Sequence, residues 1–242
     1  MTTKTAVIIG VGPEKGLGAC LGKYAAREGL HVFLAGRTPE KLLDVCSAIE
    51  AEGGRASPFQ ADTTNEKQVA ALIREAEATG PVDLAIYNAG NNYHGDFLGM
   101  SVEFFEKAWR VGTLGGFIFA REALKVMSPR EKGTLIFTGA SASMRGKPYF
   151  AAFTAAKAGL RALSQSLARE FQPKGIHVAH VVIDGGIEGD KILKNFPDFA
   201  ERVGKGGLIG LDGIAETYMH LYRQPKNAWT HEMDLRTFKE AF

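Results

Sequence analysis

The feature of the sequence that most constrains its fold is an alternation of short apolar runs with longer amphipathic segments, from end to end. The apolar runs are typical of strands buried on both faces, and the longer segments repeat at helical spacing. The predicted strands are Thr5–Ile9, His31–Ala35, Ala56–Ala61, Val82–Ile86, Thr134–Phe137, Ile176–Ile183 and Trp229–Leu235. The predicted helices are 17–29, 39–52, 65–79, 101–127, 150–171 and 212–223. This alternation predicts an α/β fold: a doubly wound seven-stranded parallel sheet, order 3-2-1-4-5-6-7, with helices on both faces.

Composition excludes several classes of protein. Of the 242 residues, 45% are apolar and 23% are charged, and no linker or composition break divides the chain, which predicts one domain over residues 1–242. The net charge of +2 without a basic block gives no reason to expect a nucleic-acid partner. No apolar run approaches the ~18 residues of a membrane span. Two cysteines, no apolar leader and no metal-ligand pattern predict a cytoplasmic protein without a metal site.

Glycines gather between the first predicted strand and the first predicted helix. Gly12, Gly16 and Gly18 give the spacing G-x-x-x-G-x-G, with Leu17 inside it. In the first turn of an alternating α/β chain, such glycines let the backbone approach a pyrophosphate, whose charge lies at the helix N-terminus. A tight turn without a ligand is the alternative. We therefore expect a Rossmann-type dinucleotide site here.

The end of the second predicted strand distinguishes two dinucleotides. An acidic residue there would bind the adenosine ribose of NAD, whereas an arginine accommodates the 2′-phosphate of NADP. The chain has Arg37 at this place and no acid before Glu40, and Lys15 lies in the glycine loop. The two cations favour NADP over NAD as cofactor, unless both are ordinary solvated charges.

Four features together resemble the short-chain dehydrogenases/reductases, from Lys4 to about Asp234. They are the glycine loop, Asp62 after the third strand, Asn88-Ala89-Gly90 after the fourth, and Lys157 in the position of the Tyr-x-x-x-Lys lysine. The resemblance implies that Asp62 binds the adenine amino group and that Lys157 binds the nicotinamide ribose. The expected cofactor-binding residues are Gly12, Lys15, Gly16, Leu17, Gly18, Arg37, Asp62, Asn88, Ala89, Gly90, Lys157 and Gly185.

The resemblance also implies hydride transfer with an Asn, a Ser, a Tyr and a Lys, and the chain departs from three of these. Phe153 stands at the tyrosine position, and phenylalanine has no titratable proton. Ala140 stands at the serine position with Ser141 one residue later, and Gly112 stands at the asparagine position. Only Lys157 is intact, so the cofactor half of the pattern is kept and the chemical half is mostly lost.

Neighbouring residues could substitute for the missing groups. Ser141 could act as a displaced serine, Tyr149 could fold into the site if it lies in a loop, and His94 follows the fourth strand. A loop histidine is a plausible proton donor, although a solvated surface role is as consistent with its position. The candidate catalytic set is Lys157, Ser141, Tyr149 and position Phe153.

Three functions remain open at this point. The first is an NADP-dependent oxidoreductase with an altered proton-transfer site, acting on a small apolar carbonyl or alcohol compound. The second is an NADP-binding sensor or partner protein with little or no turnover, and the third is a reductase of an activated double bond or imine. The glycine-rich segment 185–210 is expected to form a loop on the substrate side. Apolar helices 101–127 and 150–171 predict a homodimer or homotetramer, as the resemblance also implies.

Overall fold

A computed structural model describes residues 3–240, and its elements follow the alternation of the sequence. The strands are β1 (Thr5–Ile9), β2 (His31–Gly36), β3 (Arg55–Gln60), β4 (Val82–Tyr87), β5 (Gly133–Thr138), β6 (Ile176–Ile183) and β7 (Glu232–Leu235). The α-helices are α1 (Leu17–Arg27), α2 (Pro39–Ala51), α3 (Glu66–Thr79), α4 (Val102–Trp109), α5 (Gly115–Met127), α6 (Ala151–Phe171), α7 (Asp190–Asn195), α8 (Pro197–Val203) and α9 (Leu211–Arg223). Short turns of other helix types are η1 (Arg110–Leu114), η2 (Ser128–Arg130), η3 (Ser141–Ser143) and η4 (Gln172–Lys174).

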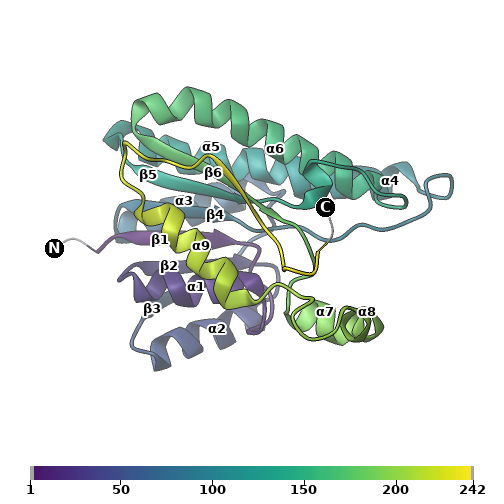
Figure 1. Cartoon of the computed structure of the whole chain (residues 1–242). Helices are drawn as coiled ribbons and strands as arrows, with labels where there is room; N and C mark the ends of the chain where they lie inside the picture. The colour runs from purple at the N-terminus through teal and green to yellow at the C-terminus, as the bar shows by residue number, and fades with distance from the viewer. Residues whose placement is uncertain (1–2, 241–242) are drawn as a thin grey trace.

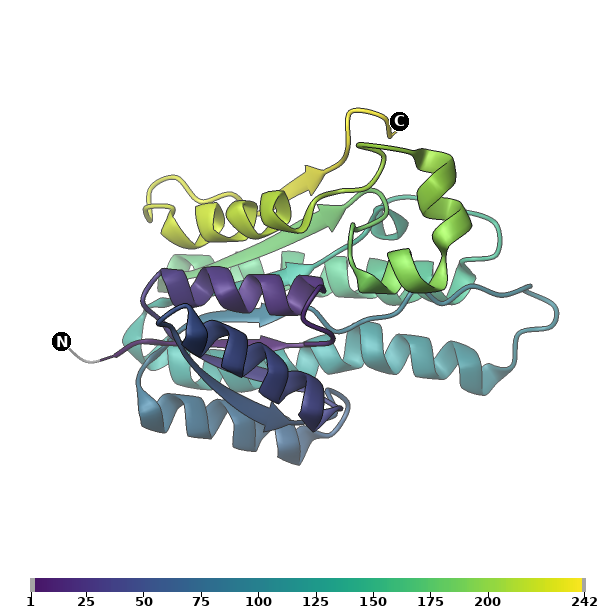
Figure 2. The same cartoon turned by 90° about the horizontal axis from the view of Figure 1, so that it is seen from below.

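The strands form one seven-stranded sheet in the order β3-β2-β1-β4-β5-β6-β7. Every neighbouring pair is parallel, which confirms the predicted fold class and strand order. Helices cover both faces, and α7 and α8 stand together beyond the carboxyl ends of the strands (Figures 1 and 2). The order reverses beside β1, and in such sheets this reversal opens a crevice at the carboxyl edge.

Each face of the sheet has its own apolar core. Helices α1, α2 and α9 pack with residues such as Ile8 and Leu34 on one face. Helices α3, α5 and α6 pack with residues such as Val7 and Phe137 on the other. Because β1, β4, β5 and β6 are buried on both faces, their sequences are almost continuously apolar.

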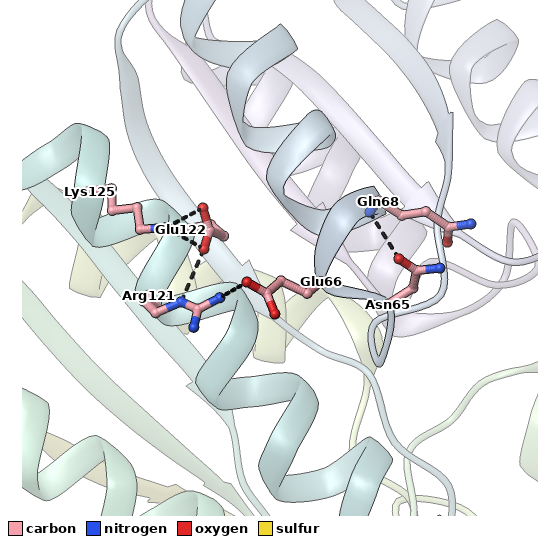
Figure 3. A network of polar contacts seen from close by, with 6 residues as sticks. All are labelled: Asn65, Glu66, Gln68, Arg121, Glu122 and Lys125. Carbon is pink, nitrogen blue, oxygen red and sulfur yellow. Dashed lines mark hydrogen bonds and ion pairs between the residues drawn. The ribbon is translucent and has the colours of Figure 1, made fainter.

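A polar network fastens α3 to α5 at the surface (Figure 3). Arg121 donates to Glu66 at 2.6 Å and to its neighbour Glu122 at 3.1 Å, and Lys125 also donates to Glu122, at 2.8 Å. Asn65 caps the start of α3 by accepting from the Gln68 backbone N–H. Of these contacts, the one between Arg121 and Glu66 joins α3 to α5, and the others lie within a single helix or its cap.

Two segments differ from the sequence prediction. The single helix expected over 101–127 is divided into α4, a π-helical turn η1 and α5. The segment 185–210, expected as a loop, contains the short helices α7 and α8. Both segments contain closely spaced glycines. Their local conformation is set by what packs against these glycines, so the sequence pattern does not predict it. Within residues 3–240, no helix is long and apolar enough to span a membrane.

Candidate functional site

The glycine loop after β1 lies against the carboxyl end of β4. Gly10 has a φ of +96°, and a Cβ there would lie 2.4 Å from the Ala89 nitrogen. A Cβ on Gly18 would lie 2.9 Å from the Gly10 carbonyl oxygen. The Asn88 amide donates to that same carbonyl at 3.1 Å, so backbone contact and one side chain lock the two segments together. At these distances, only a residue without a Cβ can occupy positions 10 and 18.

The outer part of the same loop is open. A Cβ on Gly12 would meet no atom within 4 Å. Gly16 is the N-cap of α1, offers no side-chain acceptor, and leaves the N–H groups of the first turn without a side-chain cap. Leu17 is buried behind them. An eleven-residue helix with an uncapped N-terminus facing an open glycine loop fits an anionic pyrophosphate.

Two cations flank this loop without partner carboxylates. Within residues 3–240, neither Arg37 nor Lys15 forms an ion pair, and Glu14, the neighbour of Lys15 in the chain, is bound to Lys23 at 2.8 Å. Both side chains are exposed. Their guanidinium and ammonium groups are therefore available to a phosphate beside the end of β2.

Asp62 follows β3 and lies on the same side of the crevice. One of its carboxylate oxygens accepts from the Thr64 backbone N–H at 2.8 Å and from the Thr64 hydroxyl at 2.7 Å. Partial burial raises the pKa of Asp62, but these bonds and the nearby Arg37 charge outweigh it and leave the pKa below its usual range. The carboxylate is thus ionised and held rigidly, with one oxygen already used within the chain.

Lys157 projects from α6 into the carboxyl edge of the sheet. Its Nζ donates to the Thr138 carbonyl at 2.7 Å, and a Cβ on Gly90 would lie 3.4 Å from it. The Thr138 hydroxyl in turn donates to Asn88 at 3.1 Å and accepts from Tyr218 at 2.8 Å. Burial, followed by the charge of Lys191, lowers the pKa of Lys157 to about 8. The ends of β4 and β5 therefore present one buried ammonium group.

The residues at the other three positions are now placed. Phe153 lies one turn before Lys157 on α6, with its ring centroid 6.0 Å from the Lys157 Nζ. Gly112 sits in η1 so close to α6 that a Cβ would lie 2.6 Å from the Ala156 Cβ. An asparagine could not occupy that position without moving the helices apart. Ala140 is the N-cap of η3 and offers no hydroxyl.

Ser141 belongs to a polar cluster at the end of β6. Asp184 accepts two bonds from Arg145, at 2.8 and 2.9 Å, and lies 3.5 Å from Arg236. Burial raises the pKa of Asp184, while Arg145, a hydrogen bond from Ser141 and Arg236 lower it, with a net decrease. Asp184 is 1% exposed, and its ion pair with Arg145 ties the segment after β5 to the end of β6.

Tyr149 and His94 pack against one another in the loops that follow β5 and β4. Their ring centroids are 5.6 Å apart, and the Gly95 N–H donates to the Tyr149 carbonyl at 2.9 Å. Tyr149 is 58% exposed and has a φ of +66°, an unusual conformation for a bulky side chain. Tyr149 therefore lies in a loop, one of the two alternatives open from the sequence.

Gly185 opens the segment that leads to α7. It has a φ of +151°, and a Cβ there would lie 3.3 Å from Ile209. Further along, the Asp190 N–H donates to the Lys15 carbonyl at 2.8 Å, which fastens the start of α7 to the glycine loop. Lys191 donates to Asn91 at 2.9 Å. The segment 185–210 thus spans from the glycine loop to the residues after β4.

Sequence reasoning missed several residues of the site. Thr138, Tyr218, Arg145 and Lys191 all contact it, but none belongs to a motif. Asp184 directly precedes Gly185, which the sequence analysis singled out, but no motif marked its carboxylate. Its partner Arg145 is 39 positions away in the chain, so the pair could not be inferred locally.

Comparisons with known proteins agree with this geometry. The family model for short chain dehydrogenases matches residues 4–192. A short-chain dehydrogenase from Rhodopseudomonas palustris of known structure is 38% identical, with a TM-score of 0.83, covering 98% of this chain and 99% of that one. An alcohol dehydrogenase from Thermococcus sibiricus, 23% identical over 99% and 98% of the two chains, shares the fold with a TM-score of 0.85.

The sequence relatives are more distant. The ketoacyl reductase HetN of Nostoc sp. is 28% identical over 75% of this chain, and the match spans 64% of that protein, slightly less than two thirds of its length. An uncharacterized oxidoreductase of Staphylococcus aureus is 26% identical over 98% of both chains. With the family model covering most of the sequence and a closely similar structure over its whole length, the chain belongs to the short-chain dehydrogenase family of oxidoreductases.

Proposed function

We propose that the protein is an NADP-dependent oxidoreductase with an altered proton-transfer site, acting on a small, largely apolar carbonyl or alcohol compound. The observation that carries the proposal is Lys157, buried at the carboxyl edge beside Gly90 and bound to the Thr138 carbonyl, next to an open glycine loop. When bound, NADP(H) supplies or accepts the hydride. Lys157 would hold the nicotinamide ribose, and the first turn of α1 would hold the pyrophosphate.

The preference for NADP rests on Arg37 and Lys15. Both cations lack a carboxylate partner among residues 3–240, so neither must leave an ion pair to bind a 2′-phosphate. Two proteins that share the fold support the choice: an actinorhodin polyketide ketoreductase was solved with NADPH, and the Thermococcus sibiricus alcohol dehydrogenase with 5-hydroxy-NADP. Asp62 would contribute its free carboxylate oxygen to the adenine amino group.

The proton-transfer part of the site bears on the choice between two functions, an oxidoreductase and a sensor or partner protein. Phe153 offers no proton, and the packing of Gly112 on Ala156 removes any room for an asparagine that could hold a water. Ser141 follows Ala140 as the first residue of η3, and Tyr149 packs against His94. The alternative function, an NADP-binding sensor or partner protein with little turnover, is favoured by Phe153 together with Gly112.

The segment 185–210 is the proposed substrate-side element. Leu193 and Phe196 on α7 and after it are 44% and 50% exposed, and Phe199 contacts Gly186. Apolar side chains standing beyond the ends of β4 and β6 would cover the body of a substrate. The predicted cytoplasmic location stays a prediction.

A homodimer or homotetramer is proposed from the surface of α5 and α6. Phe117 is 43% exposed there and lines a groove of about 430 Å³ with Leu124, Leu167 and Phe171. Phe119, in the same helix, is fully buried in the core and does not contribute to this surface. Light scattering should give at least twice the 26.1 kDa chain mass, and a monodisperse 26.1 kDa species would contradict the assembly.

Calorimetric titration with NADPH, NADP⁺, NADH and NAD⁺ tests the proposed function first. We expect saturable binding of the phosphorylated pair and weaker binding of the other. Oxidation of NADPH is then followed with a panel of aldehydes, ketones and quinones. Turnover supports the oxidoreductase, and tight binding without turnover supports the sensor. Absence of binding by any of the four nucleotides would refute both.

A further inference from the structure

Lys191 is the residue near the site that the functions above do not use. It lies in the first turn of α7, and its Nζ donates to the Asn91 side-chain oxygen at 2.9 Å. Asn91 directly follows Asn88-Ala89-Gly90 at the end of β4. The stem of Lys191 is exposed, but its ammonium group thus reaches the residues around Gly90, which Lys157 also contacts.

Lys157 and Lys191 both reach the residues that follow β4, Lys157 at Gly90 and Lys191 at Asn91. The charge of Lys191 is the second cause, after burial, that lowers the pKa of Lys157. Partial burial likewise lowers the pKa of Lys191 itself. Two like charges that converge on neighbouring residues disfavour one another unless a negative charge compensates them.

No carboxylate of the described chain supplies that compensation. Among residues 3–240, neither Lys157 nor Lys191 forms an ion pair with an acid. The acid nearest in sequence, Asp190, is bound instead to Lys194, at 2.7 Å. Lys191 uses one of its three N–H donors on Asn91, which leaves the others free for a ligand.

We propose that Lys191, with the charge of Lys157 behind it, binds a carboxylate of the substrate, so that the compound reduced or oxidised is an aliphatic carbonyl or hydroxy acid. This inference rests on the proposed function, because it places the acid at the same site. Ile192 and Leu193 follow Lys191 in α7, and Leu193 is 44% exposed, so the same short helix also offers apolar surface to an aliphatic body. The carboxylate of the ligand would supply the negative charge that the two lysines do not find within the described chain.

The same negative charge could come from a cofactor phosphate. The Asp190 N–H donates to the Lys15 carbonyl, so the start of α7 lies next to the glycine loop as well. Lys191 nevertheless reaches Asn91, on the β4 side, where the reacting end of a dinucleotide would lie. We therefore assign Lys191 to the substrate, and the experiment separates the two sources.

The test is calorimetric titration of the protein loaded with NADP⁺. The probes are straight-chain carboxylates from acetate to octanoate, each compared with its primary amide, which has the same shape and no charge. The protein is studied as wild type, as Lys191→Gln, and as Lys194→Gln, a matched control on the same helix whose lysine pairs with Asp190. Titration of the cofactor-free protein with the same probes, and of each variant with NADP⁺, completes the set.

We expect carboxylates of at least one chain length to bind roughly tenfold more tightly than their amides. Lys191→Gln should abolish that preference and leave NADP⁺ affinity unchanged, while Lys194→Gln should keep the preference. Equal binding of acids and amides, no binding at any chain length, or an equal loss in Lys194→Gln would overturn the proposal. A loss of NADP⁺ affinity in Lys191→Gln would assign the anion to the cofactor and also overturn it. If wild type binds no NADP⁺, the proposed function fails, whereas a carboxylate preference retained by the cofactor-free protein would still identify the anion site.

Discussion

The two halves of the carboxyl edge of the sheet differ in whether the backbone or the side chains form the expected contacts. On the β1–α1–β2 side, the expected contacts come from backbone: a glycine loop pressed on Ala89 and the uncapped first turn of α1. On the β5–α6 side, the family's chemistry comes from side chains, and here Phe153, Ala140 and Gly112 replace three of the four. Lys157, the fourth, projects from α6 and reaches Gly90, while Asn88 connects the halves through the Gly10 carbonyl and the Thr138 hydroxyl.

The difference shows which half can change without loss of the fold. The glycine loop is locked by steric contact, because a Cβ on Gly10 would lie 2.4 Å from the Ala89 nitrogen. Position 153 is half-buried on one face of a helix, where phenylalanine fills the same space as tyrosine. We therefore expect that substitutions on the α6 side change the chemistry without removing cofactor binding on the α1 side.

The largest expected effect comes from restoring the phenol. Phe153→Tyr adds one oxygen on the helix face of Lys157, whose charge would favour the ionised phenol. A positioned general acid contributes about 10²–10⁴ in rate, so NADPH-dependent carbonyl reduction should rise by up to that factor, and more with Ala140→Ser. NADPH absorbance with a ketone panel measures it.

Phe150→Tyr is the matched control, since it adds the same oxygen one turn earlier, beside His94. An equal gain in both variants would show that the position relative to Lys157 is irrelevant. Ketone reduction by the parent at about 1–10³ s⁻¹ would refute the idea that proton transfer is impaired. Tyr149→Phe and His94→Ala would then identify the donor.

The second effect is a pH dependence of stability that comes from Lys157. Its folded pKa of about 8 lies below the ordinary 10.5, so the folded state binds fewer protons than the unfolded state between these values. The free energy of unfolding therefore rises with pH in that range, by about 3 kcal/mol for this group, and the cost of the buried charge is fully present below pH 8.

Urea unfolding of the cofactor-free protein from pH 7 to pH 10 tests this, with Lys157→Met as the comparison. The unfolding free energy of the wild type minus that of Lys157→Met should increase as the pH rises. A difference that stays constant across the range would show that Lys157 titrates normally.

The third effect tests whether the asparagine position is closed. Gly112→Ala should lower the free energy of unfolding by about 1–3 kcal/mol, because its Cβ would lie 2.6 Å from the Ala156 Cβ. Gly213→Ala in α9 is the control, since a Cβ there meets nothing within 4 Å and alanine favours the helix. Denaturant midpoints measure both, and equal destabilisation would contradict the close packing of η1 on α6.

The smallest effect tests the cofactor half. Arg37→Asp should lower NADP⁺ affinity by roughly tenfold and change NAD⁺ affinity little, because only NADP⁺ carries the 2′-phosphate. Calorimetric titration measures both constants. Equal affinities of the parent for NADP⁺ and NAD⁺ would remove the basis of the preference, and an equal loss for both nucleotides would assign Arg37 a structural role.

Much of the fold was predictable because it depends on local periodicity. The alternation of buried apolar runs and amphipathic segments predicted the parallel sheet and its order, and both are confirmed. The pattern failed where glycines are dense. The π-helical turn at Gly112 interrupts a helix that looks continuous in sequence, and α7 and α8 lie in a segment that looks like a loop.

The sequence by itself determined the fold class, the glycine loop and the absence of a phenol at position 153, since each depends on neighbouring residues or on side-chain identity. Tertiary structure decided which distant groups meet. The pair of Asp184 with Arg145, the approach of Lys191 to Asn91, and the contact of Gly112 with Ala156 join residues far apart in the chain. The physical reason is that burial and Coulomb interaction depend on distance in space, which the sheet order sets and local sequence does not encode.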